Sequence, residues 1–345
     1  MPESYLITGG AGFIGANLAA HYLDRGRRVT ILDNLSRRGS ETNLRWLQSR
    51  YGNLLHVVRS DIRDLPRDLN EVLEHVDVVF HLAAQVAVTT SVVDPVGDFE
   101  VNAAGTLNIL EAVRRARSQP IVVYSSTNKV YGGLDDLPVA QLSGRYEFTD
   151  LPDGVAETRP LDFHSPYGCS KGAADQYVID YSRIYGLKTV VFRQSCIYGP
   201  HQFGVEDQGW VAWFAIRALQ RLPVTVYGDG RQVRDVLYID DLIHAYDAAI
   251  AAIATTSGKA YNIGGGPANT LSLLELIDLL ERQLGCRLDF TFDEWRPGDQ
   301  RVFVSDVRRA RDDFGWVPAT DPSAGVRKLA EWLCQEAATL EAVGV

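Results

Sequence analysis

The sequence is poor in sulfur-containing residues and has no cluster of potential metal ligands. Its 345 residues include one methionine and four well-separated cysteines, Cys169, Cys196, Cys286 and Cys334. Cysteines without close pairing or metal-ligand spacing are typical of proteins from reducing compartments. The seven histidines are scattered and form no His-Glu-x-x-His motif. We therefore expect no metal site.

Basic charge and long apolar runs are also scarce. The chain has 34 Lys and Arg against 44 Asp and Glu, a net charge of −10, which argues against a nucleic-acid-binding face. No apolar run reaches the length of a membrane-spanning helix. The start, Met1-Pro2-Glu3-Ser4, has no basic or apolar leader region. We expect a cytoplasmic protein that binds neither nucleic acid nor membrane.

The order of apolar segments indicates an α/β fold. Apolar strands are predicted at residues 5–8, 29–32, 55–58, 76–82, 121–124 and 189–193, with helices between them. The longest of these helices is predicted from about residue 95 to 117. Near-continuous apolar strands separated by helices are typical of a parallel sheet that is covered on both faces. We expect a Rossmann-type, doubly wound parallel sheet with a smaller C-terminal α/β lobe.

A glycine-rich turn directly follows the first strand. Gly9-x-x-Gly12-x-x-Gly15 stands between this strand and an amphipathic helix, and the second strand ends at Asp33. This order is the context of a dinucleotide-binding fingerprint. Gly9 permits a tight turn, Gly12 lets backbone N–H groups approach a pyrophosphate, and Gly15 lets the helix pack on the strand. The helix N-terminus attracts the anion.

Asp33 indicates which dinucleotide is bound. Its carboxylate would accept hydrogen bonds from the adenosine ribose and would repel a 2′-phosphate. That favours NAD over NADP, although Arg37 and Arg38 nearby leave NADP open. Ligands of such sheets sit beyond the carboxyl ends of the strands, where Asp61, Ala83, Ser125 and Gln194 are also predicted.

The pattern changes after Arg193. Helices are predicted at residues 210–222, 240–256 and 272–284, and strands at 224–227 and 288–292. We expect residues 1–193 to form the NAD-binding domain, with returning segments near 234–256, and residues 194–345 to form mainly a substrate-binding lobe. The segment 133–161 is too long for a simple connecting loop, and we predict that it is an insertion that lies over the site.

A tyrosine and a lysine share one face of a predicted helix. Pro166 suits a first helical position, and Tyr167 and Lys171 are four residues apart directly after it. A cation and a helix N-terminus both favour an ionised phenol. We expect Lys171 to lower the pKa of Tyr167, so that the phenol acts as a base near neutral pH.

The predicted fifth strand ends in three hydroxyl residues, Ser125-Ser126-Thr127. The Thr127 hydroxyl could hold a substrate oxygen while Tyr167 takes its proton. On its own, a hydroxyl residue at the end of a strand would be interpreted as one whose side chain hydrogen-bonds to the nearby backbone. The glycine turn, Asp33, the hydroxyl triplet and Tyr-x-x-x-Lys in this order indicate a catalytic site.

The chain resembles the extended short-chain dehydrogenases that modify nucleotide sugars. The resemblance covers nearly the whole chain and rests on the glycine turn, Asp61-Ile62, His81-Leu82-Ala83-Ala84, Tyr167-x-x-x-Lys171, Arg193-x-Ser195-x-x-Tyr198-Gly199-Pro200 and Arg234-Asp235. Residues 125–132, 162–177 and 207–211 are similar to the members that invert C2 of a CDP-hexose of the paratose/tyvelose type. The resemblance implies an epimerase with tightly bound NAD that is recycled within the catalytic cycle.

The resemblance also implies a role for each site residue. It makes Tyr167 the catalytic base and acid, Lys171 its partner and a ligand of the nicotinamide ribose, and Thr127 the group that bonds the reacting hydroxyl. The implied cofactor-binding residues are Gly9, Gly12, Phe13, Ile14, Gly15, Asp33, Asn34, Ser36, Arg37, Asp61, Ile62, Leu82, Ala83, Ala84, Gln85, Asn102, Ser125, Tyr167, Lys171 and Gln194. The implied substrate-binding residues are Thr127, Asn128, Gln208, Thr225, Tyr227, Arg234, Arg296 and Asp299.

Two positions depart from patterns in the family. Cys196 stands where many members carry a phosphate-binding Asn, which puts phosphate contacts of that loop in doubt. Asn128-Lys129 stands where the sugar 4,6-dehydratases carry an Asp-Glu pair. An amide and an amine cannot together supply the acid and base that eliminate water. Dehydration is therefore disfavoured.

We expect transient oxidation of the sugar. Tyr167 would remove the proton of the C2 hydroxyl while hydride passes to NAD, and the 2-keto sugar would turn before hydride returns to its opposite face. A UDP-sugar 4-epimerase is the alternative, because the same Tyr, Lys and Thr would serve it. A non-catalytic NAD(H) sensor is a third possibility, against which the intact Tyr167, Lys171 and Thr127 argue. The family uses the helices near 95–117 and 167–185 as a dimer surface, so a homodimer or homotetramer is expected.

Overall fold

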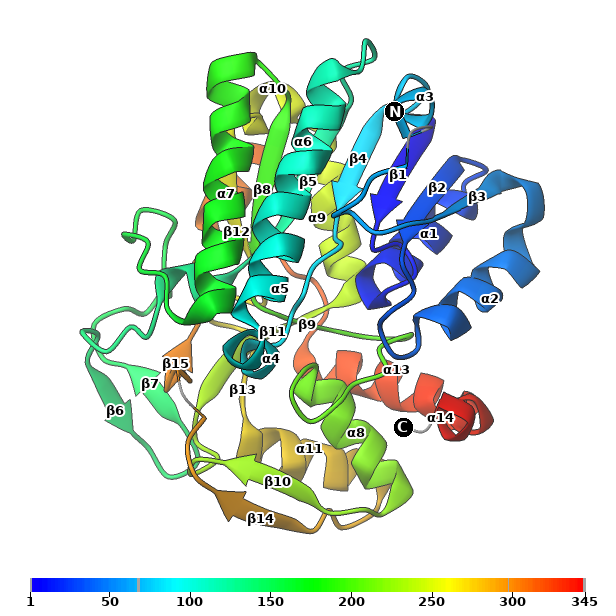
Figure 1. Cartoon of the computed structure of the whole chain (residues 1–345). Coiled ribbons are helices and arrows are strands. Elements are labelled where there is room, and N and C mark those ends of the chain that lie inside the picture. The colour runs from blue at the N-terminus through cyan, green and yellow to red at the C-terminus, as the bar shows by residue number, and fades with distance from the viewer. Residues whose placement is uncertain (1, 67–68, 297, 344–345) are drawn as a thin grey trace.

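The computed structural model describes residues 2–66, 69–296 and 298–343, and its larger part is a seven-stranded parallel sheet (Figure 1). The strand order is β12-β8-β5-β4-β1-β2-β3, and every neighbouring pair is parallel. The strands are β1 (Ser4–Thr8), β2 (Arg28–Asp33), β3 (Leu55–Arg59), β4 (Val78–His81), β5 (Ile121–Thr127), β8 (Thr189–Gln194) and β12 (Lys259–Ile263). The predicted doubly wound sheet is confirmed.

Helices cover both faces of this sheet, and alternate strand residues face the two layers. In β1, Tyr5 and Ile7 pack with one layer of helices and Leu6 with the other. The first layer comprises α1 (Phe13–Leu23), α2 (Ser40–Tyr51) and α9 (Ile239–Ala251). The second comprises α3 (Leu69–Leu73), α6 (Gly105–Arg115) and α7 (Ser165–Tyr185). The sequence therefore buries both sides of each central strand, which keeps the sheet rigid under the site.

The helix predicted at residues 95–117 is built from three segments. They are α5 (Pro95–Phe99), the π-helical turn η2 (Glu100–Ala104) and α6. The short helix α4 (Val88–Val93) precedes them, and the Asp94 side chain caps α5 by accepting from the Gly97 N–H. The wider turn at η2 contains Asn102, one of the predicted cofactor residues. π-helical turns of this kind are frequent at functional sites.

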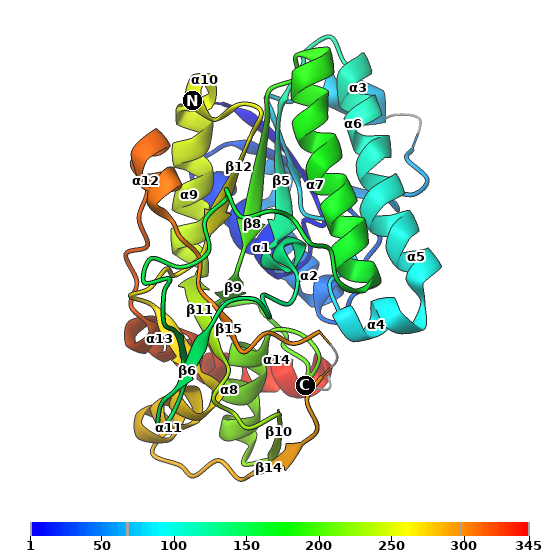
Figure 2. The same cartoon turned by 90° about the vertical axis from the view of Figure 1, so that its left-hand side faces the viewer.

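The smaller part lies below the sheet in Figures 1 and 2, on the side toward which the strands of the sheet point. It contains the parallel pair β10 (Val224–Tyr227) and β14 (Phe290–Asp293), and a sheet of β13 (Thr270–Ser272), β11 (Val233–Tyr238), β15 (Val302–Phe303) and β9 (Cys196–Tyr198). Its helices are α8 (Trp210–Gln220), α11 (Leu273–Leu284), α13 (Pro322–Gln335) and α14 (Ala337–Val343). Ser272 and Glu275 form a capping box that begins α11.

The remaining elements are short. They are η1 (Gly52–Leu54), η3 (Asn128–Tyr131), the hairpin β6 (Val139–Gln141) and β7 (Tyr146–Phe148), α10 (Ile253–Thr256) and α12 (Arg308–Phe314). After β11, the chain returns to the sheet as α9 and β12, and it then enters the smaller part again with β13. A division at residue 193 therefore leaves β12 outside the first unit although it forms an edge of that unit's sheet. Within the described residues, no helix is both long and apolar enough to cross a membrane.

Candidate active site

The glycine turn after β1 has a backbone conformation, and backbone neighbours so close, that residues with a side chain would not fit there. Gly9 has φ +68°, and a Cβ there would lie 2.7 Å from the Ala83 nitrogen. A Cβ at Gly15 would lie 2.4 Å from the Gly9 carbonyl oxygen. Gly12 precedes α1 without a side-chain cap, which leaves the N–H groups of the first turn, at Phe13 and Ile14, for an anion. This cradle fits the pyrophosphate of a dinucleotide.

Asp33 is tied to the glycine turn from the end of β2. Its Oδ2 accepts from the Ala11 N–H at 3.0 Å and its Oδ1 from the Leu35 N–H at 2.8 Å. Burial raises the pKa of the carboxyl, and these two N–H groups work against that rise. Each carboxylate oxygen keeps a further lone pair. Asp33 can therefore both shape the turn and accept from a ribose hydroxyl.

The other predicted cofactor residues come together at the carboxyl ends of adjacent strands. The Asn34 amide donates to Asp61 Oδ2 at 2.8 Å, and the Gln85 N–H donates to Asn102 Oδ1 at 2.9 Å. Beyond these contacts, Ser125 donates to Gln194 Oε1 at 3.0 Å. The remaining predicted residues follow β2, β3 and β4 as Ser36, Arg37, Ile62, Leu82, Ala83 and Ala84.

Thr127 and Tyr167 are both buried, and the Thr127 side chain is close enough to lower the pKa of the Tyr167 phenol. α7 brings Tyr167 there. The helix begins at Ser165, one residue before the predicted start, and Pro166 lies in its first turn. The Tyr167 N–H donates to Ser91 Oγ at 3.1 Å, which fixes the first turn against α4. Asn128, the next residue along η3, accepts from Thr127 at 3.3 Å.

The expected effect of Lys171 on Tyr167 is not found. Burial raises the pKa of Tyr167 to about 12, and its lowering influences are Thr127 and Arg37. The Lys171 ammonium instead donates to the Ser125 carbonyl at 2.6 Å. Burial lowers the pKa of Lys171 to about 7. The prediction of an ionised phenol was wrong for this state, because burial outweighs the cations nearby.

A buried ion pair that the sequence analysis missed lies beneath these residues. Arg193 donates from Nε and Nη2 to the two carboxylate oxygens of Asp175, at 3.0 and 2.9 Å. Ser126 Oγ donates to the same carboxylate at 2.7 Å. Asp175 follows Lys171 by four residues on α7, a spacing that could have pointed to it.

The predicted substrate residues form two groups on the lobe side. In the first, Arg234 donates to Asp299 Oδ1 at 2.5 Å. In the second, the Arg296 guanidinium lies 3.9 Å from the centre of the Tyr227 ring on β10, the strand that also carries Thr225. The Asp299 N–H donates to the Arg296 carbonyl at 3.1 Å, which joins the groups. Gln208 accepts from Arg37 across the two parts of the molecule.

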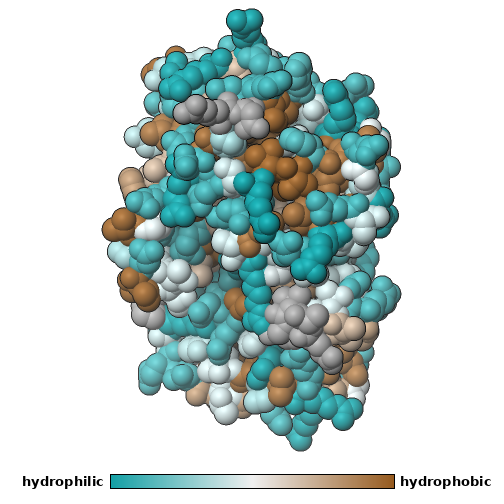
Figure 3. All heavy atoms as spheres, turned by 45° about the vertical axis from the view of Figure 1, so that its right-hand side comes forward, coloured by the Kyte–Doolittle hydropathy of each residue, from teal (hydrophilic) through white to brown (hydrophobic). Residues whose placement is uncertain are grey.

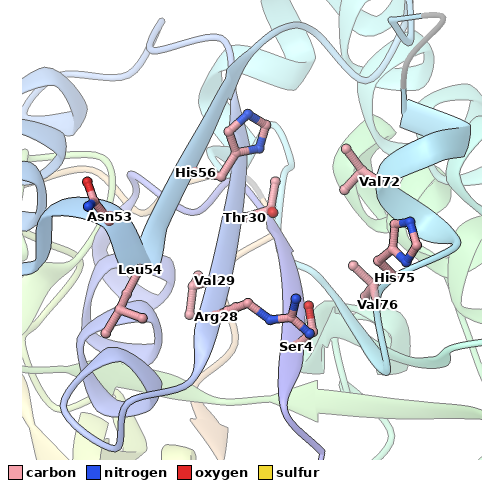
Figure 4. Close-up of a pocket in the computed structure, with 10 residues that line it drawn as sticks. All are labelled: Ser4, Arg28, Val29, Thr30, Asn53, Leu54, His56, Val72, His75 and Val76. Atoms are coloured by element: carbon pink, nitrogen blue, oxygen red, sulfur yellow. The ribbon is translucent and has the colours of Figure 1, made fainter.

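A surface pocket elsewhere is distinct from this site. Figure 3 shows one face of the molecule. Hydrophobic residues gather in its upper half, and most of the remaining surface of this face is hydrophilic. The pocket has a volume of about 230 Å³, and its lining includes Arg28 and Thr30 on β2, His56 on β3 and His75 after α3 (Figure 4). Arg28 begins β2, so the pocket lies away from the carboxyl end at which Tyr167 and the glycine turn meet.

Known proteins are similar to this chain in sequence and in fold. The model of the NAD dependent epimerase/dehydratase family matches residues 5–264. The chain belongs to this family. It is 48% identical over 335 residues to CDP-paratose 2-epimerase of Salmonella typhi, a match that covers 95% of this chain and 98% of the relative.

Solved members of the family have the same fold. UDP-glucose 4-epimerase of Thermotoga maritima, solved with UDP-glucose, has a TM-score of 0.81 at 30% identity and covers 97% of this chain and 99% of its own. UDP-glucose 4-epimerase of Thermus thermophilus, solved with NAD, has a TM-score of 0.77 at 32% identity over 96% and 99%. Family membership makes this chain an NAD-dependent enzyme, as predicted.

Proposed function

We propose that this enzyme inverts C2 of a CDP-hexose of the paratose/tyvelose type. The similarity to the Salmonella typhi enzyme supports this choice, because it is considerably higher than the similarity to the 4-epimerases. The order of the charged groups supports a nucleotide sugar. From the Thr127–Tyr167 pair, contacts run through Lys129, Asp299 and Arg234 and end at Arg296 and Tyr227.

That order matches the parts of the substrate. A sugar at Thr127 and Tyr167 would continue into a diphosphate beside Arg234, whose forked guanidinium suits phosphate oxygens. The ribose and base would then lie toward Arg296 and Tyr227. Asp299 would not contact the diphosphate, since a carboxylate repels it. We propose that it orients Arg234 and bonds a hydroxyl.

Tyr167 and Thr127 would perform the proton chemistry. When bound, NAD would supply a reversible hydride acceptor, and the Gly9–Gly15 turn, Asp33 and Lys171 would hold it. Thr127 would donate to or accept from the C2 oxygen and fix it beside the Tyr167 phenol. Tyr167 would take the C2 hydroxyl proton and return it after the keto sugar has rotated to present its opposite face. Because the net redox change is zero, the cofactor would stay bound.

Product analysis tests the proposal against the alternatives. The purified protein with bound NAD is incubated in deuterated water with CDP-paratose, and separately with UDP-glucose, and the sugar protons are followed by NMR. Inversion at C2 without deuterium at that carbon is expected, because the hydride returns internally. Inversion of UDP-glucose at C4 instead would favour the 4-epimerase, and no turnover of either would favour the NAD(H) sensor.

We also propose that two copies associate through α5, α6 and α7, which lie side by side in Figures 1 and 2. α5 exposes the large apolar side chains of Val96 and Phe99, and α7 exposes those of Tyr177, Ile184 and Tyr185. Light scattering should give the mass of a dimer or a tetramer. Phe99→Arg on α5 should lower that mass, whereas Phe292→Arg, at an exposed residue of β14, should not.

A further inference from the structure

Lys129 is a mostly buried cation on the substrate side of the site. It lies in η3, two residues after Thr127, and its backbone N–H donates to Thr127 Oγ1 at 3.2 Å. Its side chain is 22% exposed. The ammonium donates to the Gly298 carbonyl at 3.3 Å and stands 3.9 Å from Asp299 Oδ1. Among the described residues, a single carbonyl bond leaves most of the ammonium's three donors without a close acceptor.

The charge around Lys129 is not balanced by its neighbours. The groups that act on it electrostatically are Asp299, Arg234 and Cys196. Asp299 Oδ1 accepts from Arg234 at 2.5 Å, much nearer than the Lys129 ammonium. Two cations therefore share one carboxylate, while the Cys196 thiol has its pKa raised by burial and stays neutral. A positive charge with reduced solvation is favoured only if an anion completes the site.

We infer that Lys129 binds the sugar-side phosphate of the substrate and holds it together with Arg234. This inference rests on the proposed nucleotide-sugar substrate and adds a binding residue to it. Lys129 is two residues from Thr127, at the sugar end of the site, whereas Arg296 and Tyr227 lie at the other end. The phosphate nearest to Lys129 is therefore the one attached to the sugar.

A two-point grip on this phosphate suits the reaction. The keto sugar must turn over inside the site without leaving it. Rotation about the bonds between sugar and phosphate allows this only if the phosphate stays fixed. Arg234 and Lys129 approach from different elements, β11 and η3, and can hold two oxygens of one phosphate group.

Nucleotide binding tests the inference without requiring turnover. CDP carries the sugar-side phosphate and CMP lacks it, so their affinities are compared by calorimetry in the NAD-loaded protein. In Lys129→Met we expect CDP to bind about 10- to 100-fold more weakly, the effect of one charged hydrogen-bond donor, and CMP to bind as in the wild type. Lys188→Met, at an exposed lysine of the loop before β8, is the matched control and should change neither affinity.

The charge itself is tested by a conservative variant and by pH. Burial lowers the pKa of Lys129 to about 8 in the free protein, and a bound phosphate would raise it. Wild-type affinity for CDP should therefore fall above pH 8, by up to tenfold per pH unit. Lys129→Arg should restore CDP binding and lose this dependence, because a guanidinium stays charged. Thermal unfolding of each variant shows whether it is folded.

The outcomes separate this inference from the proposed function. Equal loss of CMP and CDP, unchanged CDP binding in Lys129→Met, or an unchanged pH dependence in Lys129→Arg would overturn the role of Lys129. A selective loss of CDP binding together with absence of C2 inversion would retain that role and refute the proposed reaction. If wild-type protein binds no CDP, both are wrong.

Discussion

The Lys171 ammonium donates a 2.6 Å hydrogen bond to the main-chain carbonyl of Ser125 and lies 4.3 Å from the centre of the Tyr124 ring. The Lys171 ammonium thus bonds to the backbone of β5, whereas the Tyr-x-x-x-Lys spacing predicts that it acts on Tyr167. Burial leaves the pKa of that phenol at about 12. The protein without cofactor is therefore not prepared to act as a base, and a further positive charge is needed.

The first prediction concerns the ionisation of Tyr167. The oxidised nicotinamide ring is a cation, and a cation near a buried phenol lowers its pKa. The tyrosinate absorbance of wild type minus Tyr167→Phe is recorded between pH 7 and 10. We expect no Tyr167 signal in cofactor-free protein and a clear signal with NAD⁺. NADH, whose ring is uncharged, is the control. Equal titrations with and without NAD⁺ would contradict this account.

The second prediction concerns turnover. Tyr167→Phe removes the proton acceptor while keeping the ring that packs at the start of α7. We expect kcat to fall by about 10²- to 10⁴-fold, the usual contribution of a general base, with CDP affinity unchanged. Tyr177→Phe changes a 47% exposed residue of the same helix and should leave kcat as it is. Near-normal turnover in Tyr167→Phe would exclude the proposed mechanism.

Much of the sheet could be predicted because its signal is local. Apolar runs such as residues 29–32 and 189–193 require burial on both faces wherever they lie in the fold, and the structure places them in β2 and β8. β11 was not predicted, because the charged residues Arg234 and Asp235 interrupt the apolar pattern that is typical of a buried strand. Asp235 is buried nevertheless, since Ser195 and the Gly266 N–H donate to it.

The partners of the site residues could not be predicted in the same way. Helical spacing places Tyr167 and Lys171 on one face, but the acceptor of the ammonium, Ser125, comes from a different strand. Lys129 likewise gains its neighbours Cys196, Arg234 and Asp299 from distant parts of the chain, and no local pattern contains them. The catalytic and binding roles stay predictions that the experiments here address.

A third prediction concerns cofactor choice. Asp33→Ala removes the charge that disfavours a 2′-phosphate, so NADP should bind better relative to NAD, measured by fluorescence titration. The Ala11 and Leu35 N–H groups would also lose their acceptors, at a cost of about 1–3 kcal/mol each. Asp33→Asn keeps an acceptor oxygen without the charge, so it should change the NADP preference with a smaller loss of stability. An unchanged ratio in both variants would assign Asp33 to the turn alone.

The fourth prediction concerns the ion pair under the site. Asp175→Asn leaves the buried Arg193 guanidinium without its counter-charge, and such a loss costs about 3–5 kcal/mol of unfolding free energy. Asp180, one turn further along α7, pairs with Arg183 at 3.3 Å, and the two side chains are 48% and 69% exposed. Exposed pairs contribute about 0–1 kcal/mol, so Asp180→Asn is the matched control. Urea unfolding of both variants should separate them clearly. A similar loss of unfolding free energy in both variants would mean that water reaches Arg193 and that the ion pair does not stabilise β5 and β8.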